Sequence, residues 1–195
     1  INTSKLLGKV GIKKAFLKPE AIANPRALEK ILEADLIVLG PGNHFCSIIP
    51  NLLVEGVSDA IRRSKAKVVY NCNLVNKRGH TDGYTVDDYV AEINGYLGGE
   101  RVDFVTYNKK RPSEKLLAEY RKEDSELVSF HKTESAKKYR VVVSDFLNTK
   151  KVVRQKADAI GATRSFIRHD GHKLAKTLVM LLEVDAYEKI FREIV

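Results

Sequence analysis

The residues best suited to bind a ligand lie in a glycine-containing loop that follows the apolar run Leu36–Leu39. The loop reads Gly40-Pro41-Gly42-Asn43-His44-Phe45-Cys46-Ser47. Glycine allows close approach of the backbone, and a loop that runs from a strand into a helix presents N–H groups to an anion. Asn43 and Ser47 would add an amide and a hydroxyl. The spacing matches neither GxGxxG nor a P-loop, so an anion-binding loop and a tight turn without a ligand both remain open.

A second polar loop follows the next apolar run and extends over residues 71–83. Its Asn73, Thr81 and Asp82 offer hydrogen bonds to a base or a sugar, and Lys77-Arg78 offers positive charge to a phosphate. Long loops in compact domains are often functional. The alternative is a crossover in which Thr81 and Asp82 cap the next helix, because such residues favour caps and turns without any ligand.

The sequence contains no recognisable catalytic or metal-binding arrangement. His169 and His172 are three residues apart, but no third ligand is placed by spacing. Asp170 is most simply interpreted as the N-cap of the helix that follows. GxSxG, HExxH and catalytic Cys–His patterns are absent. We therefore predict no catalytic residue and no metal site.

Two isolated cysteines, Cys46 and Cys72, form no CxxC pair. They suit a reducing compartment, and we expect both to be small buried residues. No apolar run approaches the roughly 20 residues that span a bilayer, and no signal peptide is visible. The chain is therefore expected to be cytoplasmic, without membrane contact. Because it opens with Ile1, it is interpreted as a fragment.

The chain carries a net charge of +9 over 195 residues. Such a charge attracts either nucleic acid or small anions. The basic residues are spread along the chain and are not interleaved with aromatic residues, as they are in a stacking platform for bases. We therefore expect a small phosphorylated molecule as the partner and not nucleic acid, and a homodimer stays open.

The elements that must position the two loops alternate between short apolar runs and helical periodicity. Strands are expected at residues 14–17, 36–39, 68–70, 104–107, 127–130 and 140–143. Helices are expected from Pro25, near Pro50, and at 57–63, 86–97 with Thr85 as cap, 113–120, 171–183 and 186–195. This alternation predicts an α/β fold with a parallel sheet, whose ligands bind beyond the carboxyl ends of the strands. We expect one domain over 1–195, with 131–166 as a charged excursion or small subdomain.

Two stretches carry a resemblance to a known family: ADLIVLGPGNHFCSIIPNLLVEGVSDAI at 34–61 and KAKVVYNCNLVNKRGHTDGYTVDDYV at 65–90. Weaker support comes from the helix at 112–120 and from residues 167–170. The chain resembles the phospholactate transferase (CofD)-like family, and within it the gluconeogenesis factor (YvcK) branch. The resemblance implies a Rossmann-like three-layer α/β/α fold with a mostly parallel sheet.

The resemblance also implies a function. Members of the gluconeogenesis-factor branch bind UDP-sugars and regulate carbon metabolism, cell-wall synthesis and cell shape, without established catalysis. The alternative is the transferase branch, which moves a phosphorylated acid from a guanylated donor to a deazaflavin with Mg²⁺. A basic nucleic-acid-binding module is a third possibility, from charge alone.

The residues that the resemblance assigns to the ligand lie in three segments. The first loop contributes Gly40, Gly42, Asn43 and Ser47, and the second contributes Asn73, Gly79, Thr81, Asp82 and Gly83. In the UDP-sugar branch a tyrosine and an arginine near the carboxyl end contact the ligand, and Tyr120 and Arg168 look like their counterparts. A guanidinium fork matches phosphate, whereas Tyr120 would equally pack on a helix face.

Three departures from the branch affect the ligand prediction. The branch usually carries Ser-Leu-Tyr-Thr where this chain has Asn43–Cys46, and Met-Thr-Gln-Pro-Gly-Glu where it has Val75–His80. The second change replaces an acid by His80 and adds two cations, so a different ligand preference is expected. The family also begins with a strand and a glycine-rich phosphate loop. This chain has neither, and its start matches the middle of the family.

Overall fold

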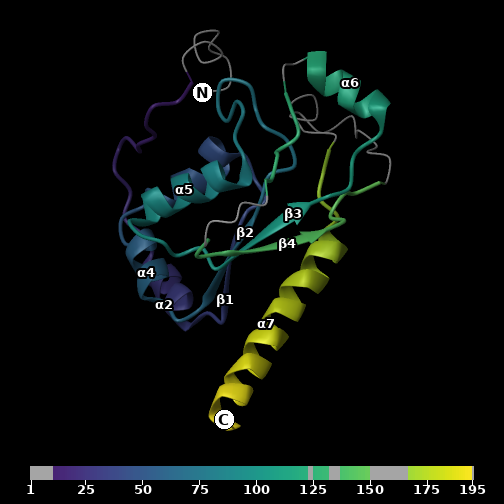
Figure 1. Ribbon diagram of the computed structural model, residues 1–195. Helices are drawn as coiled ribbons and strands as arrows, with labels where there is room; N and C mark the ends of the chain where they lie inside the picture. Colours follow the sequence, from purple (N-terminus) through teal and green to yellow (C-terminus); the bar gives the residue numbers. More distant parts are fainter. Residues whose placement is uncertain (1–10, 123–124, 132–136, 150–166, 195) are drawn as a thin grey trace, which may run out of the picture.

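The structure, a computed structural model, describes residues 11–122, 125–131, 137–149 and 167–194. Its centre is a four-stranded sheet in the order β1-β2-β3-β4, and every neighbouring pair is parallel. The strands are β1 (Leu36–Leu39), β2 (Lys67–Asn71), β3 (Phe104–Asn108) and β4 (Arg140–Ser144). The sheet confirms the predicted α/β fold, because the carboxyl ends of all four strands meet at one edge (Figure 1).

Helices connect the strands in the predicted alternation. They are α2 (Pro25–Glu33), the π-helical turn η1 (His44–Ile48), α3 (Ile49–Leu52), α4 (Val57–Arg63), α5 (Val86–Leu97), α6 (Glu114–Lys122) and α7 (Gly171–Ile194). Their ends follow local chemistry. Asn24 caps α2 ahead of Pro25, and Thr85 forms a capping box with Asp88 at the start of α5. Gly98 ends α5 in the left-handed region.

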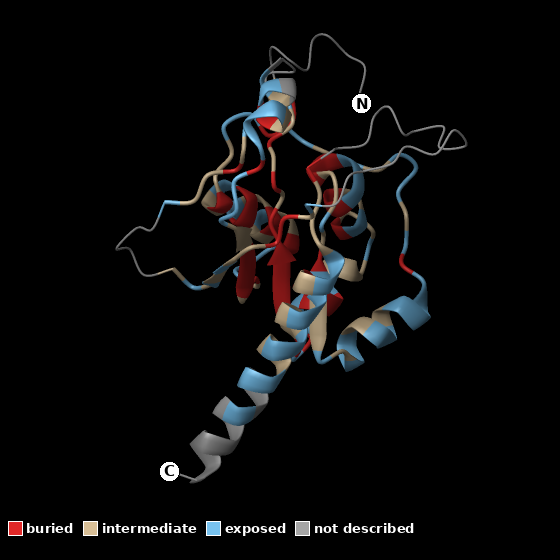
Figure 2. Ribbon diagram, turned by 90° about the vertical axis from the view of Figure 1, so that its right-hand side faces the viewer, coloured by how far each residue is buried: buried red, intermediate tan, exposed pale blue. Residues whose placement is uncertain are grey.

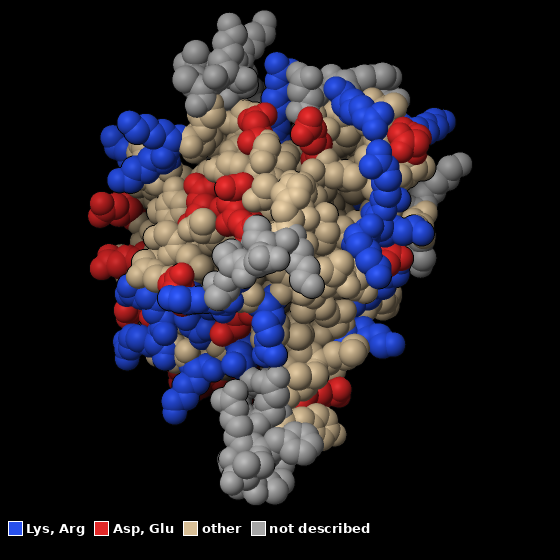
Figure 3. Space-filling view, in the orientation of Figure 1, with Lys and Arg blue, Asp and Glu red and all other residues tan. Residues whose placement is uncertain are grey.

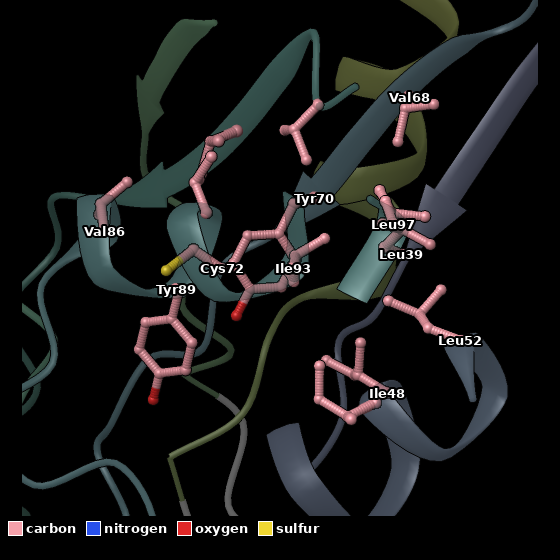
Figure 4. Close-up of a cluster of buried hydrophobic side chains, with 14 of the residues drawn as sticks. Leu39, Ile48, Leu52, Val68, Tyr70, Cys72, Val86, Tyr89, Ile93 and Leu97 are labelled. Atoms are coloured by element: carbon pink, nitrogen blue, oxygen red, sulfur yellow. The ribbon is translucent and has the colours of Figure 1, made fainter. Parts of the chain in front are cut away.

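The helices lie on both faces of the sheet, as a three-layer fold requires. Helices α2, α4 and α5 lie on one side, and α7 crosses the other (Figures 1 and 2). The main core lies between the sheet and the first group of helices. Figure 4 labels buried residues of this core from β1, β2, η1, α3 and α5, with Cys72 directly after β2: Leu39, Ile48, Leu52, Val68, Tyr70, Cys72, Val86, Tyr89, Ile93 and Leu97. Strands β2 and β3 are buried almost throughout, as the interior strands of a parallel sheet are.

The structure differs from the predicted elements in three places. Residues 14–17 form no strand. Residues 127–130 form isolated bridges only, from Leu127 to Val75 and from Ser129 to Thr85. The two expected C-terminal helices form one helix, α7. The expected break lies at 184–185, where the sequence has neither glycine nor proline to end a helix. Strand β4 lies inside the span predicted as an excursion, 131–166. Residues 132–136 and 150–166 of that span lie outside the described residues.

Within the part of the chain that the structure describes, no helix combines the length and the apolar character needed to cross a bilayer.

Candidate functional site

The two predicted loops lie side by side at the carboxyl edge of the sheet. Two carboxamides join them: Asn71 Nδ2 donates to Gly40 O at 3.3 Å, and Asn73 Nδ2 donates to Gly42 O at 3.1 Å. Each bond connects residues that are 31 positions apart in the sequence. The parallel register explains the contact, because Leu39 pairs with Tyr70 and both chains then leave the sheet together.

The first loop requires glycine at its start. Gly40 has a φ of +79°, and a Cβ there would lie 3.2 Å from Asn71 O. A Cβ on Gly42 would lie 3.2 Å from the Cβ of Ser47. Tight backbone packing therefore accounts for both glycines. The loop leads directly into η1, whose first turn leaves N–H groups without helical partners.

Asn43 already occupies part of this potential anion site. It is the N-cap of η1, and its Oδ1 accepts a hydrogen bond from the Cys46 N–H at 3.1 Å. Its predicted contact with a ligand stays a prediction, and the carboxamide oxygen already has a partner within the loop. Ser47 is exposed on the same turn, so its hydroxyl faces solvent. The N–H groups of Ser47 and Ile48 donate to the Asn43 carbonyl at 2.8 and 3.2 Å, so the exposed Ser47 hydroxyl is what this turn offers to an anion.

The polar side chains of the second loop largely hold the loop itself. Asn73 accepts from the Tyr70 hydroxyl at 3.1 Å while it donates to the first loop. Thr81 Oγ1 accepts from the Lys77 N–H at 2.9 Å, and Asp82 Oδ2 accepts from the Gly79 N–H at 2.6 Å. Neither residue caps helix α5, so the predicted capping of the next helix is wrong. Both side chains instead accept backbone hydrogen bonds within their own loop.

The glycines of the second loop provide its turns. Gly79 and Gly83 have φ values of +75° and +68°, which favour glycine. Gly83 has open space where a Cβ would be. The structure accounts for both glycines by the shape of the turn, and their role at a ligand stays a prediction.

The third predicted segment, around Arg168, joins the same edge. The Tyr120 hydroxyl accepts a hydrogen bond from the Ile167 N–H at 3.1 Å, so Tyr120 anchors the residue before Arg168. The Arg168 carbonyl accepts from the Asn148 N–H at 2.9 Å. His169 then donates from Nε2 to the Cys72 carbonyl at 3.1 Å. Tyr120 and Arg168 are thus neighbours, and His169 fixes their segment to the end of β2.

Asp170 completes this segment as predicted. Its Oδ1 accepts from the N–H groups of His172 and Lys173, at 3.0 and 3.2 Å, at the start of α7. Lys173 reaches back to Asp145 after β4, with 2.9 Å between Nζ and Oδ2. The hydrogen bond from Lys173 holds the pKa of the Asp145 carboxyl below its ordinary value. The carboxyl edge therefore carries several fixed charges.

Each loop contains a buried histidine, His44 in the first and His80 in the second, that was not among the predicted site residues. The His44 ring packs at 4.9 and 5.0 Å between the rings of Phe45 and Tyr89, and its Nε2 lies 3.3 Å from a Glu92 carboxylate oxygen. That contact has the distance but not the alignment of a hydrogen bond. His80 Nδ1 also has no hydrogen-bond partner among the described residues. Burial lowers the pKa of His80, and the charge of Lys77 lowers it further.

Residues that hold the site were also missed where they end strands. Asn71 is the last residue of β2 and Asn108 the last of β3. Asn71 Oδ1 accepts from Thr106 Oγ1 at 3.0 Å, and Asn108 Oδ1 accepts from the Phe146 N–H at 3.0 Å. A carboxamide that ends an apolar strand is the sequence signal that would have identified both.

The cysteines differ from each other. Cys72 is buried as expected, and burial raises the pKa of its thiol to about 12. Cys46 is exposed, so the prediction that it is buried is wrong. The π-helical turn after Asn43 places Cys46 and Ser47 outward while Phe45 and Ile48 enter the core.

Charge and donor chemistry at this edge favour anions over metal ions. Figure 3 shows a band of lysine and arginine on the side where α6 and the ends of β3 and β4 lie in Figure 1. Lys109, Lys110 and Arg111 follow β3 directly and are exposed. Among the residues that the structure describes, no group of three or more His, Cys, Asp or Glu side chains could hold a metal ion. The carboxylate of Asp82, the best candidate for Mg²⁺, is already bonded to the Gly79 N–H.

A separate cavity of about 320 Å³ lies at the opposite, amino end of β3 and β4 and includes none of the predicted residues. Its charged groups are paired with each other. Arg101 Nη1 contacts Asp103 at 2.8 Å, and Lys137 Nζ contacts Asp87 at 2.5 Å. These ion pairs stabilise the fold around the cavity, and their charged groups already have partners.

Three comparisons with known proteins agree with this geometry. A family model described as 2-phospho-L-lactate transferase CofD matches residues 1–147. A putative gluconeogenesis factor from Thermotoga maritima is 52% identical over 106 residues, which are 54% of this chain and 33% of that protein. The gluconeogenesis factor of Bacillus subtilis is 35% identical over 173 residues, which are 88% of this chain and 51% of that protein.

A solved structure has the same fold. The crystal structure of a UPF0052 family member from Bacillus halodurans superposes with a TM-score of 0.72 and 31% identity, over 89% of this chain and 53% of that chain. This chain thus spans between a third and about half of the length of the relatives described here.

Proposed function

The chain belongs to the 2-phospho-L-lactate transferase CofD family, and we propose that it binds a nucleotide-sugar, of the UDP-sugar class, as a regulatory protein of carbon metabolism and cell-wall synthesis. The relatives that carry the name gluconeogenesis factor support the regulatory half of this proposal. The ligand half rests on the geometry of the carboxyl edge.

One observation carries the proposal: three segments distant in sequence converge at the carboxyl ends of parallel strands. The loop after β1 is bonded to the loop after β2 through Asn71 and Asn73. The segment of Arg168 is bonded to β2 through His169. Ligands of open α/β sheets bind at this edge.

Each segment has a separate role toward the ligand. The first loop offers the exposed Ser47 hydroxyl to a phosphate oxygen, beside the glycines that let the backbone approach it. Arg168 contributes a guanidinium whose fork matches a diphosphate. Asn73, Thr81 and Asp82 act as positioning residues, because their polar atoms hold the two loops in register.

Titration calorimetry with UDP-N-acetylglucosamine and with GDP tests the proposal. We expect the UDP-sugar to bind more tightly than GDP. Arg168→Ala should lose roughly 1.5–3 kcal/mol of binding free energy, the range for hydrogen bonds to charged groups. Arg63→Ala is the matched control, because Arg63 ends α4 at the opposite edge of the sheet and contacts only the neighbouring Asp59 among the described pairs. Equal affinities of the two variants would remove Arg168 from the site.

The family model favours a second candidate, transfer of a phosphorylated acid from a guanylated donor to a deazaflavin. That reaction uses Mg²⁺, and the described residues do not provide the clustered carboxylates of a preformed metal site. Tighter binding of GDP than of the UDP-sugar in the same calorimetry, with turnover of the deazaflavin, would replace the first proposal by this one.

A further inference from the structure

The segment between β3 and α6 presents cations at the carboxyl edge of the sheet, beside the candidate site. Lys109, Lys110 and Arg111 follow β3 directly and are exposed. Figure 3 shows lysine and arginine gathered on this side of the molecule. The segment leads into α6, the helix that carries Tyr120. None of the three cations is among the predicted ligand residues, so they add positive charge to an edge that already carries Arg168.

Hydrogen bonds connect this segment to the segment of Arg168. The Asn148 N–H donates to the Arg168 carbonyl at 2.9 Å, and the Phe146 N–H donates to Asn108 Oδ1 at 3.0 Å. The Lys109 N–H donates to the carbonyl of the last residue of β4 at 2.9 Å. The chain that follows β4 therefore joins the two segments, and Lys109 lies along the same edge as Arg168.

The backbone that carries the two lysines is held by Asn108. Its Oδ1 accepts a hydrogen bond from the Lys110 N–H at 3.3 Å, and its Nδ2 donates to the Lys110 carbonyl at 2.7 Å. An asparagine that bonds to the backbone two residues further on fixes a turn. Because Lys109 and Lys110 are both exposed, this fixed turn presents two ammonium groups to solvent.

Two acids of this edge already have cationic partners, whereas the two lysines do not. Asp145 Oδ2 lies 2.9 Å from Lys173 Nζ, and Glu114 Oε1 lies 3.1 Å from Arg111 Nε. Within the part of the chain that the structure describes, neither of the two lysines forms an ion pair. This part of the edge therefore keeps two positive charges that an acidic group of a ligand can meet.

Given the nucleotide-sugar site proposed above, on which this inference depends, we propose that Lys109 and Lys110 bind a carboxylate on the sugar of the ligand. The ligand then belongs to the nucleotide-uronic acid class. The diphosphate is assigned to Ser47 and Arg168, near the ends of β1 and β2, and β3 is the next strand along the edge. Of the two ends of a UDP-sugar only the sugar can carry an acid, because the uracil ring is neutral. A lysine ammonium, a compact charge on a flexible stem, suits such a group.

Titration calorimetry with UDP-glucuronate and UDP-glucose tests this inference. The two ligands differ only in the carboxylate that replaces a hydroxymethyl group on the sugar. We expect UDP-glucuronate to bind about tenfold more tightly, which corresponds to 1.4 kcal/mol. Two exposed ion pairs together supply an effect of this size. In the double variant Lys109→Gln, Lys110→Gln the affinity for UDP-glucuronate should fall to that for UDP-glucose. Raising the salt concentration from about 0.05 M to about 0.5 M should also reduce the preference, because salt screens exposed charges.

Lys65→Gln is the matched control. Lys65 is also exposed, but it precedes β2 and so lies at the amino edge of the sheet, opposite the candidate site. The variant removes one positive charge, as each lysine substitution in the test does. We expect it to keep the preference for UDP-glucuronate, since only charges near the carboxylate contribute appreciably at ordinary salt.

The possible failures are distinguishable. If the wild type binds the two ligands with equal affinity, the nucleotide-sugar site stands and the carboxylate site is refuted. A preference that survives in the double lysine variant would assign the carboxylate to other residues. A preference that Lys65→Gln also abolishes would come from the net charge of the chain. Either result overturns the inference. If neither ligand binds, the proposed function fails and the carboxylate site fails with it.

Discussion

Removing the carboxamide of Asn73 should destabilise the protein and separate its two loops. Asn73 accepts a hydrogen bond from the Tyr70 hydroxyl at 3.1 Å and donates one to Gly42 O at 3.1 Å. Tyr70 is fully buried in the main core (Figure 4). In Asn73→Ala the Tyr70 hydroxyl loses its acceptor in an environment without water. A buried polar group left unsatisfied costs about 1–3 kcal/mol, and we expect a loss in that range.

A double-mutant cycle isolates the hydrogen bond itself. Tyr70→Phe removes the donor and leaves the half-buried Asn73 carboxamide, which water can reach, so its cost should be smaller, about 0.5–1.5 kcal/mol. The double variant lacks both partners and leaves no orphaned hydroxyl. Its cost should therefore fall short of the sum of the single costs by about 1 kcal/mol.

Urea unfolding followed by far-ultraviolet circular dichroism measures these costs, since the chain contains no tryptophan as a fluorescent probe. The comparison holds if the m values of the variants agree with that of the wild type. Costs that add within about 0.3 kcal/mol would mean that Tyr70 and Asn73 are uncoupled. Asn73 would then not connect the buried Tyr70 to the first loop.

Three further predictions concern other parts of the fold. Arg101→Met should cost about 3–5 kcal/mol in urea unfolding, because the guanidinium bonds to Ile61, Ser64 and Ala66 carbonyls and to Asp103; a cost below about 1 kcal/mol would contradict this. Gly40→Ala should cost more than Gly83→Ala, because both have positive φ but only Gly40 lacks room for a Cβ; equal melting temperatures would refute the close approach. Burial lowers the pKa values of His80 and His169 in the folded state, so the unfolded chain binds more protons and stability is complete above about pH 6.5 and falls as the pH drops below it. Replacement of both by glutamine should flatten the dependence of unfolding free energy on pH between about 5.5 and 6.5, and an unchanged slope would exclude these two groups as its source.

The fold could be predicted to a large extent because its signals are local. Short apolar runs at Leu36–Leu39 and at the other three strands alternate with helical periodicity, which determines an α/β sheet with parallel strands. Thr85 and Asp170 identified two helix starts, since a cap needs only N–H groups two or three residues away. The errors at 14–17 and 127–130 share one cause. Those segments have strand-like composition, but neither joins the sheet: 14–17 forms no strand, and 127–130 forms only isolated bridges to Val75 and Thr85.

The adjacency of the two loops was predicted, whereas the partner of each polar side chain was not. Loops after neighbouring parallel strands had to meet, so the pairing of the two loops followed from the order of the elements. The use of each side chain did not follow. Asn43, Thr81 and Asp82 were expected at a ligand, yet their polar atoms bond to backbone N–H groups within their own turns. Composition cannot distinguish a polar side chain that meets a ligand from one that meets its own loop.

The sequence alone determined the parallel sheet and the edge at which its loops gather, because these depend on periodicity, caps and spacing along the chain. The family was indicated by the resemblance of residues 34–61 and 65–90 to known members. Only the tertiary structure decided that Asn71 and Asn73 join two loops and that His169 fixes the segment of Arg168 to β2. It also decided that Cys46 faces solvent and that α7 exposes large apolar side chains. Each of these depends on which atoms of distant segments come within hydrogen-bonding or packing distance. That proximity is set by the register of the strands and by the path of the helices across the sheet.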